Sequence, residues 1–290
     1  MIDSDQLRSF IVFAETRNFT RAAERLAISQ PSLHVKIRKL AESLDVALYR
    51  RVGRNLELTP EGERLLGFAR DSSERSTRFE AELHGRRAEQ PVVLAAGEGA
   101  YLYLLGGAIQ RFVGKRGKPS LRLLVRDRDA ALEAVRRGEA HLGVTALDER
   151  PLDLWTQKLV EVQMVAVVPA RHRLARRRTL RLADLDGERW IVPPAGRPHR
   201  ATLSRALDAA GIRWEPVVET SGWELMLHFA RLGIGVAIVN SCCTIPRGLV
   251  AKSLPELPGI PYYLVQRERA VSPGVDELRD TFLATVRPSR

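Results

Sequence analysis

The stretch TRAAERLAISQPSLHVKIRKL, residues 20–40, constrains the fold more than any other part of this 290-residue sequence. It contains two short helical patterns with only Ile28 and Ser29 between them. Thr20 can cap the first helix through its hydroxyl, and Ser29 can cap the second, where Pro31 is tolerated in the first turn. Such a tight connection predicts two helices that cross at a large angle, as in a helix-turn-helix.

The second of these helices carries polar side chains beside an apolar stripe. The stripe has helical spacing and consists of Leu33, Ile37, Leu40 and Leu44. In a helix-turn-helix, side chains early in the second helix meet base edges in the major groove, while cations and hydroxyls nearby reach phosphates. The predicted base contacts are Gln30, Ser32 and His34, and the predicted phosphate contacts are Thr20, Lys36, Arg38 and Lys39.

The flanking sequence decides between this unit and an ordinary helical hairpin with a solvated basic face. Upstream, a stripe at helical spacing predicts a first helix and consists of Leu7, Phe10, Ile11 and Ala14. Downstream, LYRRVGRNLELTPEG, residues 48–62, has a Gly-Arg-Asn turn between β-prone pieces at residues 47–51 and 55–58. This pattern predicts a wing whose backbone-phosphate contacts are Arg50, Arg51 and Arg54.

About the first 66 residues resemble the N-terminal half of LysR-type transcriptional regulators. The resemblance is carried by LRSFIVFAETRNFTRAAERLAISQPSLHVKIRKLAESL, LYRR, Arg54 and LTPEGERLL. It implies a winged helix-turn-helix over residues 1–58 that binds a two-fold symmetric operator in double-stranded DNA. The chain departs from the residues that the family often has at His34, Val35, Lys36 and Asp45. These departures concern which operator sequence is read.

The residues after the wing predict a long helix with a seam. Thr59 provides a cap, Pro60 fits the first turn, and acidic residues follow near the positive end of the helix dipole. Small and apolar side chains then recur in steps of four and three: Leu65, Ala69, Ser72, Ser76, Phe79 and Leu83. This heptad pattern predicts that the linker, residues 59–90, pairs with its twin in a homodimer, which can assemble into a homotetramer.

The alternative is an amphipathic helix packed on its own domain. HGRRAEQP, residues 84–91, predicts a hinge.

From Val92 onward, strand patterns alternate with helical ones, which predicts mostly parallel sheets with helices on both faces. Three segments, GEAHLGVTA, LRLADLDGERWIV and WELMLHFARLGIGVAIVN, resemble the effector domain of the same regulators, which is similar to periplasmic binding proteins. The resemblance implies an effector-binding domain over residues 91–290 with two α/β subdomains. The first comprises residues 91–161 and 266–290, and the second comprises residues 162–265. A small-molecule effector would bind between them.

Four loops at strand ends are expected to line that cleft, because ligands of such sheets bind beyond the carboxyl ends of strands. The predicted effector contacts are Gly97, Glu98, Gly99, Tyr101, Thr145, Pro194, Arg197, His199, Arg200, Ser221 and Trp223. Arg and His side chains favour an anionic group on the ligand. Glu98 either pairs with Arg197 or Arg200 or faces a cation on the ligand. For Tyr101 and Trp223, the alternative is a packing role.

Composition limits the remaining functions. The net charge is +11, but residues 1–90 contain 16 Lys/Arg against 14 Asp/Glu, and the densest arginine run, ARHRLARRRTLRL, lies at residues 170–182. Charge alone therefore does not locate a DNA site. No apolar run approaches the ~20 residues of a membrane span, and the N-terminus lacks the features of a signal peptide, so we expect a cytoplasmic protein.

Motifs for catalysis or metal binding are not found. The adjacent Cys242 and Cys243 are expected to be free, packing thiols, since the apolar, neutral segment VNSCCTIP argues against a lowered pKa. The sequence lacks zinc-ligand spacing, dinucleotide and P-loop fingerprints and a Ser nucleophile elbow. The prediction is a transcription regulator controlled by an effector, without metal, cofactor or catalytic residues. Two alternatives stay open: an architectural DNA-binding protein without effector, and an enzyme or solute-binding module fused to a DNA-binding domain.

Overall fold

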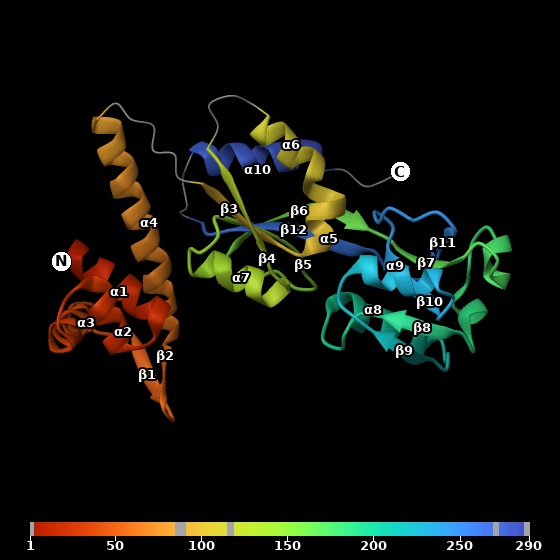
Figure 1. The fold of residues 1–290 in the computed structure, drawn as a ribbon, viewed down its shortest axis with the longest axis horizontal. Helices are drawn as coiled ribbons and strands as arrows, with labels where there is room; N and C mark the ends of the chain where they lie inside the picture. Colours follow the sequence, from red (N-terminus) through yellow and green to blue (C-terminus); the bar gives the residue numbers. More distant parts are fainter. Residues whose placement is uncertain (1–2, 85–90, 115–118, 269–272, 287–290) are drawn as a thin grey trace.

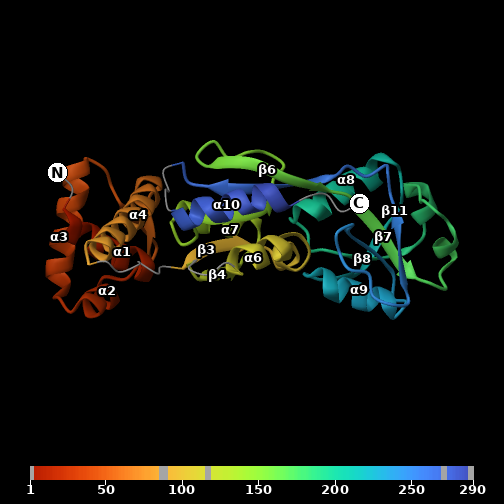
Figure 2. The same ribbon diagram turned by 90° about the horizontal axis from the view of Figure 1, so that it is seen from above.

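The computed structural model describes residues 3–84, 91–114, 119–268 and 273–286. Its elements form three units in a row: a small helical unit at the N-terminus, and then two sheets that are each flanked by helices (Figure 1). Viewed from above, the N-terminal unit and the second sheet lie at opposite ends of the molecule (Figure 2). The long helix α4, Pro60–Leu83, connects the N-terminal unit to the rest.

The N-terminal unit is the predicted winged helix-turn-helix. Its helices are α1 (Ser4–Thr16), α2 (Phe19–Leu26) and α3 (Gln30–Leu44), and its core includes Phe10, Phe13, Leu33 and Leu40. Ser29 caps α3 as predicted, because its side chain accepts a hydrogen bond from the backbone N–H of Ser32. The prediction that Thr20 caps α2 is wrong. Asn18 is the cap, because α2 begins one residue earlier, at Phe19.

The wing is an antiparallel hairpin of β1 (Tyr49–Val52) and β2 (Asn55–Leu58). Val52 pairs with Asn55, so the turn consists of Gly53 and Arg54 alone and is one residue shorter than expected. Gly53 has φ +60°, a conformation that glycine adopts without steric cost. Arg54 therefore lies at the tip of the wing.

Helix α4 begins as predicted, with the Thr59 hydroxyl accepting a hydrogen bond from the Gly62 N–H. The prediction that its whole heptad stripe forms a seam is wrong at the N-terminal end. Leu65 and Ala69 are buried in the core of their own winged helix-turn-helix, because α4 packs against α1. Farther along, Phe79 and Leu83 are 60% and 68% exposed. The N-terminal half of α4 therefore packs on its own domain, while the apolar side chains of its C-terminal half stay exposed.

The first sheet has the strand order β4-β3-β5-β12-β6 and defines subdomain I. Its strands are β3 (Val92–Ala96), β4 (Leu121–Val125), β5 (Leu142–Ala146), β6 (Trp155–Val162) and β12 (Ile260–Gln266). Helices α6 (Gly106–Val113) and α10 (Pro273–Thr285) pack on one face, and α7 (Arg128–Arg136) packs on the other. A short helix α5 (Glu98–Ala100) and a π-helical turn, Tyr101–Leu105, lead into α6.

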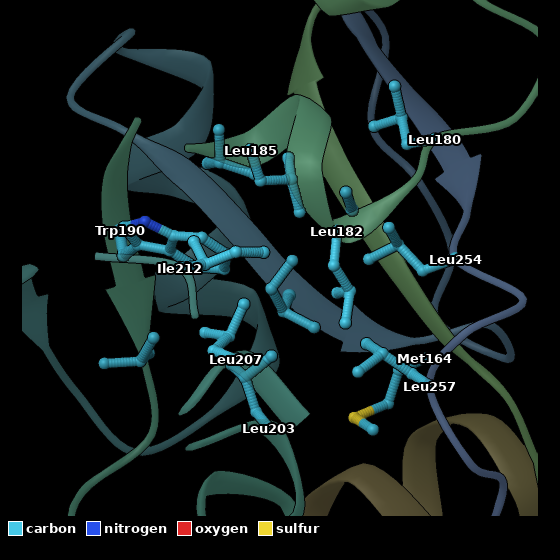
Figure 3. Close-up of a cluster of buried hydrophobic side chains, with 14 of the residues drawn as sticks. Met164, Leu180, Leu182, Leu185, Trp190, Leu203, Leu207, Ile212, Leu254 and Leu257 are labelled. Carbon is cyan, nitrogen blue, oxygen red and sulfur yellow. The ribbon is translucent and has the colours of Figure 1, made fainter. Parts of the chain in front are cut away.

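The second sheet has the order β11-β7-β10-β8-β9 and defines subdomain II. Its strands are β7 (Met164–Pro169), β8 (Arg189–Val192), β9 (Glu215–Glu219), β10 (Val236–Asn240) and β11 (Leu249–Ser253). Helices α8 (Pro198–Ala209) and α9 (Trp223–Arg231) and the 3₁₀ turns Arg173–Arg176 and Leu182–Leu185 cover it. Figure 3 shows one of its two cores, where Trp190, Leu203 and Leu207 pack together.

Two expectations about these sheets need correction. Both sheets are mixed, since β12 runs antiparallel to β5 and β6, and β7 runs antiparallel to β10 and β11. Strands β7 and β12 each enter their sheet directly from a strand of the other sheet, β6 and β11 respectively. They are therefore not joined to their neighbours by the crossover helix that parallel pairing needs. Because β12 belongs to the first sheet, subdomain II ends before Ile260 and not at residue 265.

Helix α4 is also attached to subdomain I by paired charges, which we call the ionic junction. Glu63 accepts two hydrogen bonds from Arg137, at 2.7 and 2.8 Å, and Asp71 pairs with Arg267. Glu74 lies 3.0 Å from the His141 ring. Gly67 permits this approach, because a Cβ there would be 2.6 Å from the carbonyl oxygen of Arg136. The winged helix-turn-helix is thus held against subdomain I within one chain.

Candidate DNA interface and effector cleft

The predicted base contacts lie on the first turns of α3, at the end of the molecule farthest from the sheets (Figures 1 and 2). Gln30, Ser32 and His34 are all exposed. The Thr20 hydroxyl donates a hydrogen bond to the Gln30 side-chain oxygen at 3.2 Å, which orients that amide. The His34 ring stacks on Phe19, with ring centres 3.6 Å apart. These contacts hold two of the side chains in defined positions before any DNA is bound.

The predicted phosphate contacts fall into two groups. Lys36 is paired with Asp5 at 2.6 Å, Arg38 with Glu42 at 3.6 Å and Arg50 with Glu57 at 3.3 Å. By contrast, Lys39, Arg51 and Arg54 have no ion-pair partner within the described part of the chain. Unpaired cations are the ones that can neutralise phosphates without first losing another partner. Lys39, Arg51 and Arg54 are therefore the best placed of this set.

A cavity of about 320 Å³ lies between subdomains I and II. Its walls come from the ends of β3, β4 and β5 on one side and from the loops after β8 and β9 on the other, as the strand-end rule predicts. The predicted residues that line it are Gly97, Glu98, Gly99, Thr145, Pro194, Arg197, His199, Ser221 and Trp223. The cleft is thus where the sequence placed it.

Two predicted residues, Tyr101 and Arg200, do not line this cavity. The Tyr101 hydroxyl lies 2.7 and 3.0 Å from the carbonyl oxygens of Leu94 and Leu124, so it braces β3 against β4, and burial raises its pKa to about 12. The Arg200 guanidinium lies 4.5 Å from the centre of the Trp214 ring and donates to Ser204. Both predictions are wrong because each side chain finds partners inside its own subdomain.

Several lining residues were missed by the sequence reasoning. Arg126, Asp127 and Arg128 follow β4 directly, and the strand-end rule would have found them had it been applied to that strand. Tyr262 also lines the cavity, but it lies on an antiparallel strand that the rule does not cover. Its position depends on the strand order of the first sheet, which local sequence does not reveal.

Most charges in the cavity wall are paired within the protein. Arg197 pairs with Asp127 at 3.6 Å across the cleft, and Arg128 pairs with acidic residues at 2.9 and 3.5 Å. The expectation that Glu98 pairs with Arg197 or Arg200 is therefore wrong. Within the described ranges, Glu98 forms no ion pair or hydrogen bond. It is an exposed carboxylate in the wall of the cavity.

The two subdomains touch where Trp223 lies against Gly99. A Cβ on Gly99 would be 2.5 Å from the Trp223 indole, so only glycine leaves room for the ring. Beside this contact, a Cβ on Gly222 would be 3.8 Å from a Glu98 carboxylate oxygen. The Trp223 ring also meets the His199 ring edge-on, with centres 4.6 Å apart. Trp223 therefore serves both packing and the lining of the cavity.

His199 is 6% exposed, and neither ring nitrogen has a hydrogen-bond partner among the described residues. Burial lowers its pKa to about 3, so the imidazole is neutral at physiological pH. A neutral imidazole has one donor and one acceptor, and leaving both unpaired in a buried position is costly. His199 thus offers the cavity two unused hydrogen-bonding groups but no positive charge.

The adjacent cysteines lie just beyond β10, and both are free thiols, as predicted. The expectation that Cys242 has no lowered pKa is wrong, because a hydrogen bond from the neighbouring Cys243 thiol lowers the pKa of Cys242. The described residues contain no group of three or more His, Cys, Asp or Glu side chains that could hold a metal ion. No helix in the same part of the chain is long and apolar enough to cross a membrane.

Comparisons with known proteins agree on one family. Residues 4–63 match the model of bacterial regulatory helix-turn-helix proteins of the lysR family, and residues 85–287 match the LysR substrate binding domain. The HTH-type transcriptional regulator CysL of Bacillus subtilis is 26% identical over 81% of this chain and 80% of its own. The RuBisCO operon transcriptional regulator of Allochromatium vinosum is 24% identical over 96% of this chain and 95% of its own.

Solved structures share the fold. ArgP from Mycobacterium tuberculosis has a TM-score of 0.75 at 18% identity, with all of both chains covered. A full-length OxyR variant from Pseudomonas aeruginosa has a TM-score of 0.70 at 21% identity, covering 97% of this chain and 95% of the other. With its helix-turn-helix and its effector-binding domain both matched, the chain belongs to the LysR family of transcriptional regulators.

Proposed function

We propose that the protein binds a two-fold symmetric operator as a homodimer, or as a homotetramer made of two such dimers, and that a small-molecule effector in the cleft controls its arrangement on DNA. The protein would act in the cytoplasm, where its operator is. The observation that carries this proposal is the coexistence of an exposed, preorganised α3 at one end of the molecule and an open cavity between the two subdomains. A ligand that prefers one arrangement of the subdomains shifts the population toward it.

For DNA, we assign base reading to Gln30, Ser32 and His34 and phosphate contacts chiefly to Lys39, Arg51 and Arg54. The amide of Gln30 can pair bidentately with adenine. The support is exposure and preorganisation, since Thr20 and Phe19 already orient two of the three side chains. Lys36, Arg38 and Arg50 can join the phosphate contacts only by giving up their acidic partners.

For the dimer, we assign the seam to the exposed apolar stripe of α4. Phe68 is 50% exposed and takes the place of the buried Leu65 and Ala69 at the N-terminal end of the stripe. The seam then consists of Phe68, Ser72, Ser76, Phe79 and Leu83. The spacing keeps these side chains on one helix face, and two serines allow close approach of the partner helix.

The DNA assignment is tested by Gln30→Ala in a competition assay between operator and random DNA. Loss of one bidentate base contact should reduce discrimination by about 1–3 kcal/mol. Arg54→Ala is the matched control, because loss of a phosphate contact should weaken binding to all sequences and flatten the log–log salt dependence by about one unit. If Gln30→Ala weakens operator and random DNA equally, its amide does not read bases.

The dimer assignment is tested by Phe79→Glu in analytical ultracentrifugation. Two like charges would face each other across the seam, so the dimer should dissociate to monomers. Leu152→Glu is the control, because it adds the same charge at another fully exposed apolar side chain. An unchanged oligomer in the Phe79→Glu variant would mean that α4 does not form the seam.

A further inference from the structure

The charge balance of the cleft indicates what kind of molecule it accepts. An abundance of arginine around the cavity first indicated an anionic ligand. In the folded protein, however, the Arg197 charge is matched by Asp127, and the Arg128 charge is matched by Asp129 and Asp148. Arg200 faces away from the cavity, and His199 is neutral. The cations that favoured an anion are therefore largely unavailable to it.

Two charged side chains of the lining stay unpaired within the described ranges. Arg126 donates only to the carbonyl oxygen of Val125, which precedes it in the chain. Glu98 has no partner, and its carboxylate lies close to Gly222 of the opposite subdomain. A group that binds at Glu98 would touch both subdomains at once.

The surroundings of Glu98 suit a positively charged group. The Trp223 indole lies next to it against Gly99, and aromatic rings attract cations. Deeper in the wall, buried His199 has two unpartnered ring nitrogens, and Thr145 presents its side chain at the end of β5. These groups can form hydrogen bonds with neutral polar atoms of a ligand without adding charge.

We propose that the effector carries an ammonium or guanidinium group, which binds between the Glu98 carboxylate and the Trp223 indole and so bridges subdomains I and II. The proposal rests on the proposed function of the cleft and specifies its ligand class. Any carboxylate on the same molecule would be directed toward Arg126, the unpaired cation of the wall. A purely anionic effector would instead leave Glu98 facing a like charge.

The test uses two sets of matched probes. The first set has a five-carbon chain and consists of pentylamine, pentan-1-ol and pentanoate. The second set has a phenyl ring and consists of benzylamine, benzyl alcohol and benzoate. Each set thus offers a cation, a neutral molecule and an anion. Each probe is titrated into the full-length protein, and binding is measured by thermal shift and calorimetry, because a ligand that binds only the folded state stabilises it by an amount that rises with the logarithm of its concentration relative to Kd. The proteins are wild type, Glu98→Gln, and Glu215→Gln, which removes an exposed carboxylate outside the cavity wall.

The expected result is that the amine of each set binds best to wild type and to Glu215→Gln. In Glu98→Gln, amine affinity should fall roughly 10- to 100-fold, because a hydrogen bond to a charged group is lost. Tighter binding of the carboxylates, or unchanged amine binding to Glu98→Gln, would overturn the ligand class while leaving the cleft as the effector site. Binding of none of the six probes to wild type would overturn the ligand class and also count against the proposed cleft.

Discussion

Two junctions link the three units of this molecule, and they are built in opposite ways. The ionic junction between α4 and subdomain I is closed by paired side chains, among them Arg137 with Glu63 and Arg267 with Asp71. The cleft between subdomains I and II keeps a cavity of about 320 Å³ and an unpaired Glu98. A small molecule can enter the second junction, but the first is already filled by the protein itself.

This difference indicates which part moves. Subdomain I is fixed to the DNA-binding unit, so a ligand that closes the cleft should move subdomain II relative to the other two units. Beyond the cavity, the Tyr103 hydroxyl donates to Glu224 on α9 across the boundary, and Trp223 rests on Gly99. The chain itself crosses this boundary between β6 and β7 and between β11 and β12, and such segments at the ends of elements can act as hinges.

Gly99→Val should have the largest effect on the cleft and none on the ionic junction. A branched side chain at Gly99 would overlap the Trp223 indole, since even a Cβ would be 2.5 Å from it. The ring must then leave, and the two subdomains can no longer approach each other. We expect the effector to lose its influence on transcription while operator affinity stays unchanged, as measured by reporter output and DNA binding with and without effector.

Gly107→Val is the control for this experiment. It introduces the same side chain into a helix of the same subdomain, where a Cβ would meet nothing within 4 Å. The control should keep a full response. A full response in Gly99→Val would mean that the contact between Gly99 and Trp223 is not needed for signalling. Loss of operator binding in Gly99→Val alone would contradict the separation of the two junctions.

The same contrast explains what the sequence could predict. The winged helix-turn-helix depends on local features: Ser29 as a cap, the stripe around Leu33, and glycine at the wing turn. Each of these is visible in a few consecutive residues. The strand ends that line the cleft were also predictable, because the fold class places ligands there.

The errors concern choices between partners far apart in the chain. Arg200 lies two residues beyond the start of α8, and its direction toward Trp214 depends on a loop that follows that helix. Leu65 fits a heptad seam and a domain core equally well by spacing. The ionic junction was not predicted at all, because Asp71 and Arg267 are separated by 196 residues and nothing local links them.

A smaller effect is expected at the ionic junction from Arg267→Ala. The Arg267 side chain is 14% exposed, pairs with Asp71 and also donates to the carbonyl oxygen of Val135 at the end of α7. Its removal leaves a partly buried carboxylate without its cation, which should weaken docking of α4 by about 1–3 kcal/mol. Hydrogen exchange should become faster in α4 around Asp71 and at the end of α7, while effector affinity stays unchanged because Arg267 does not line the cavity.

Arg279→Ala is the matched control, because Arg279 is also paired with carboxylates, Asp276 and Asp280, but only within α10. It should leave exchange in α4 unchanged. At high salt, hydrogen exchange in α4 of the wild-type protein should become faster, as in Arg267→Ala, because salt weakens partly exposed ion pairs. If the junction fixes subdomain I to the DNA-binding unit, the Arg267→Ala variant should still bind effector but pass less of the signal to the operator. If the variant transmits the full effector signal despite faster exchange in α4, signalling to the DNA-binding unit does not depend on the ionic junction. The ionic junction would then not differ from the cleft in the way that we infer.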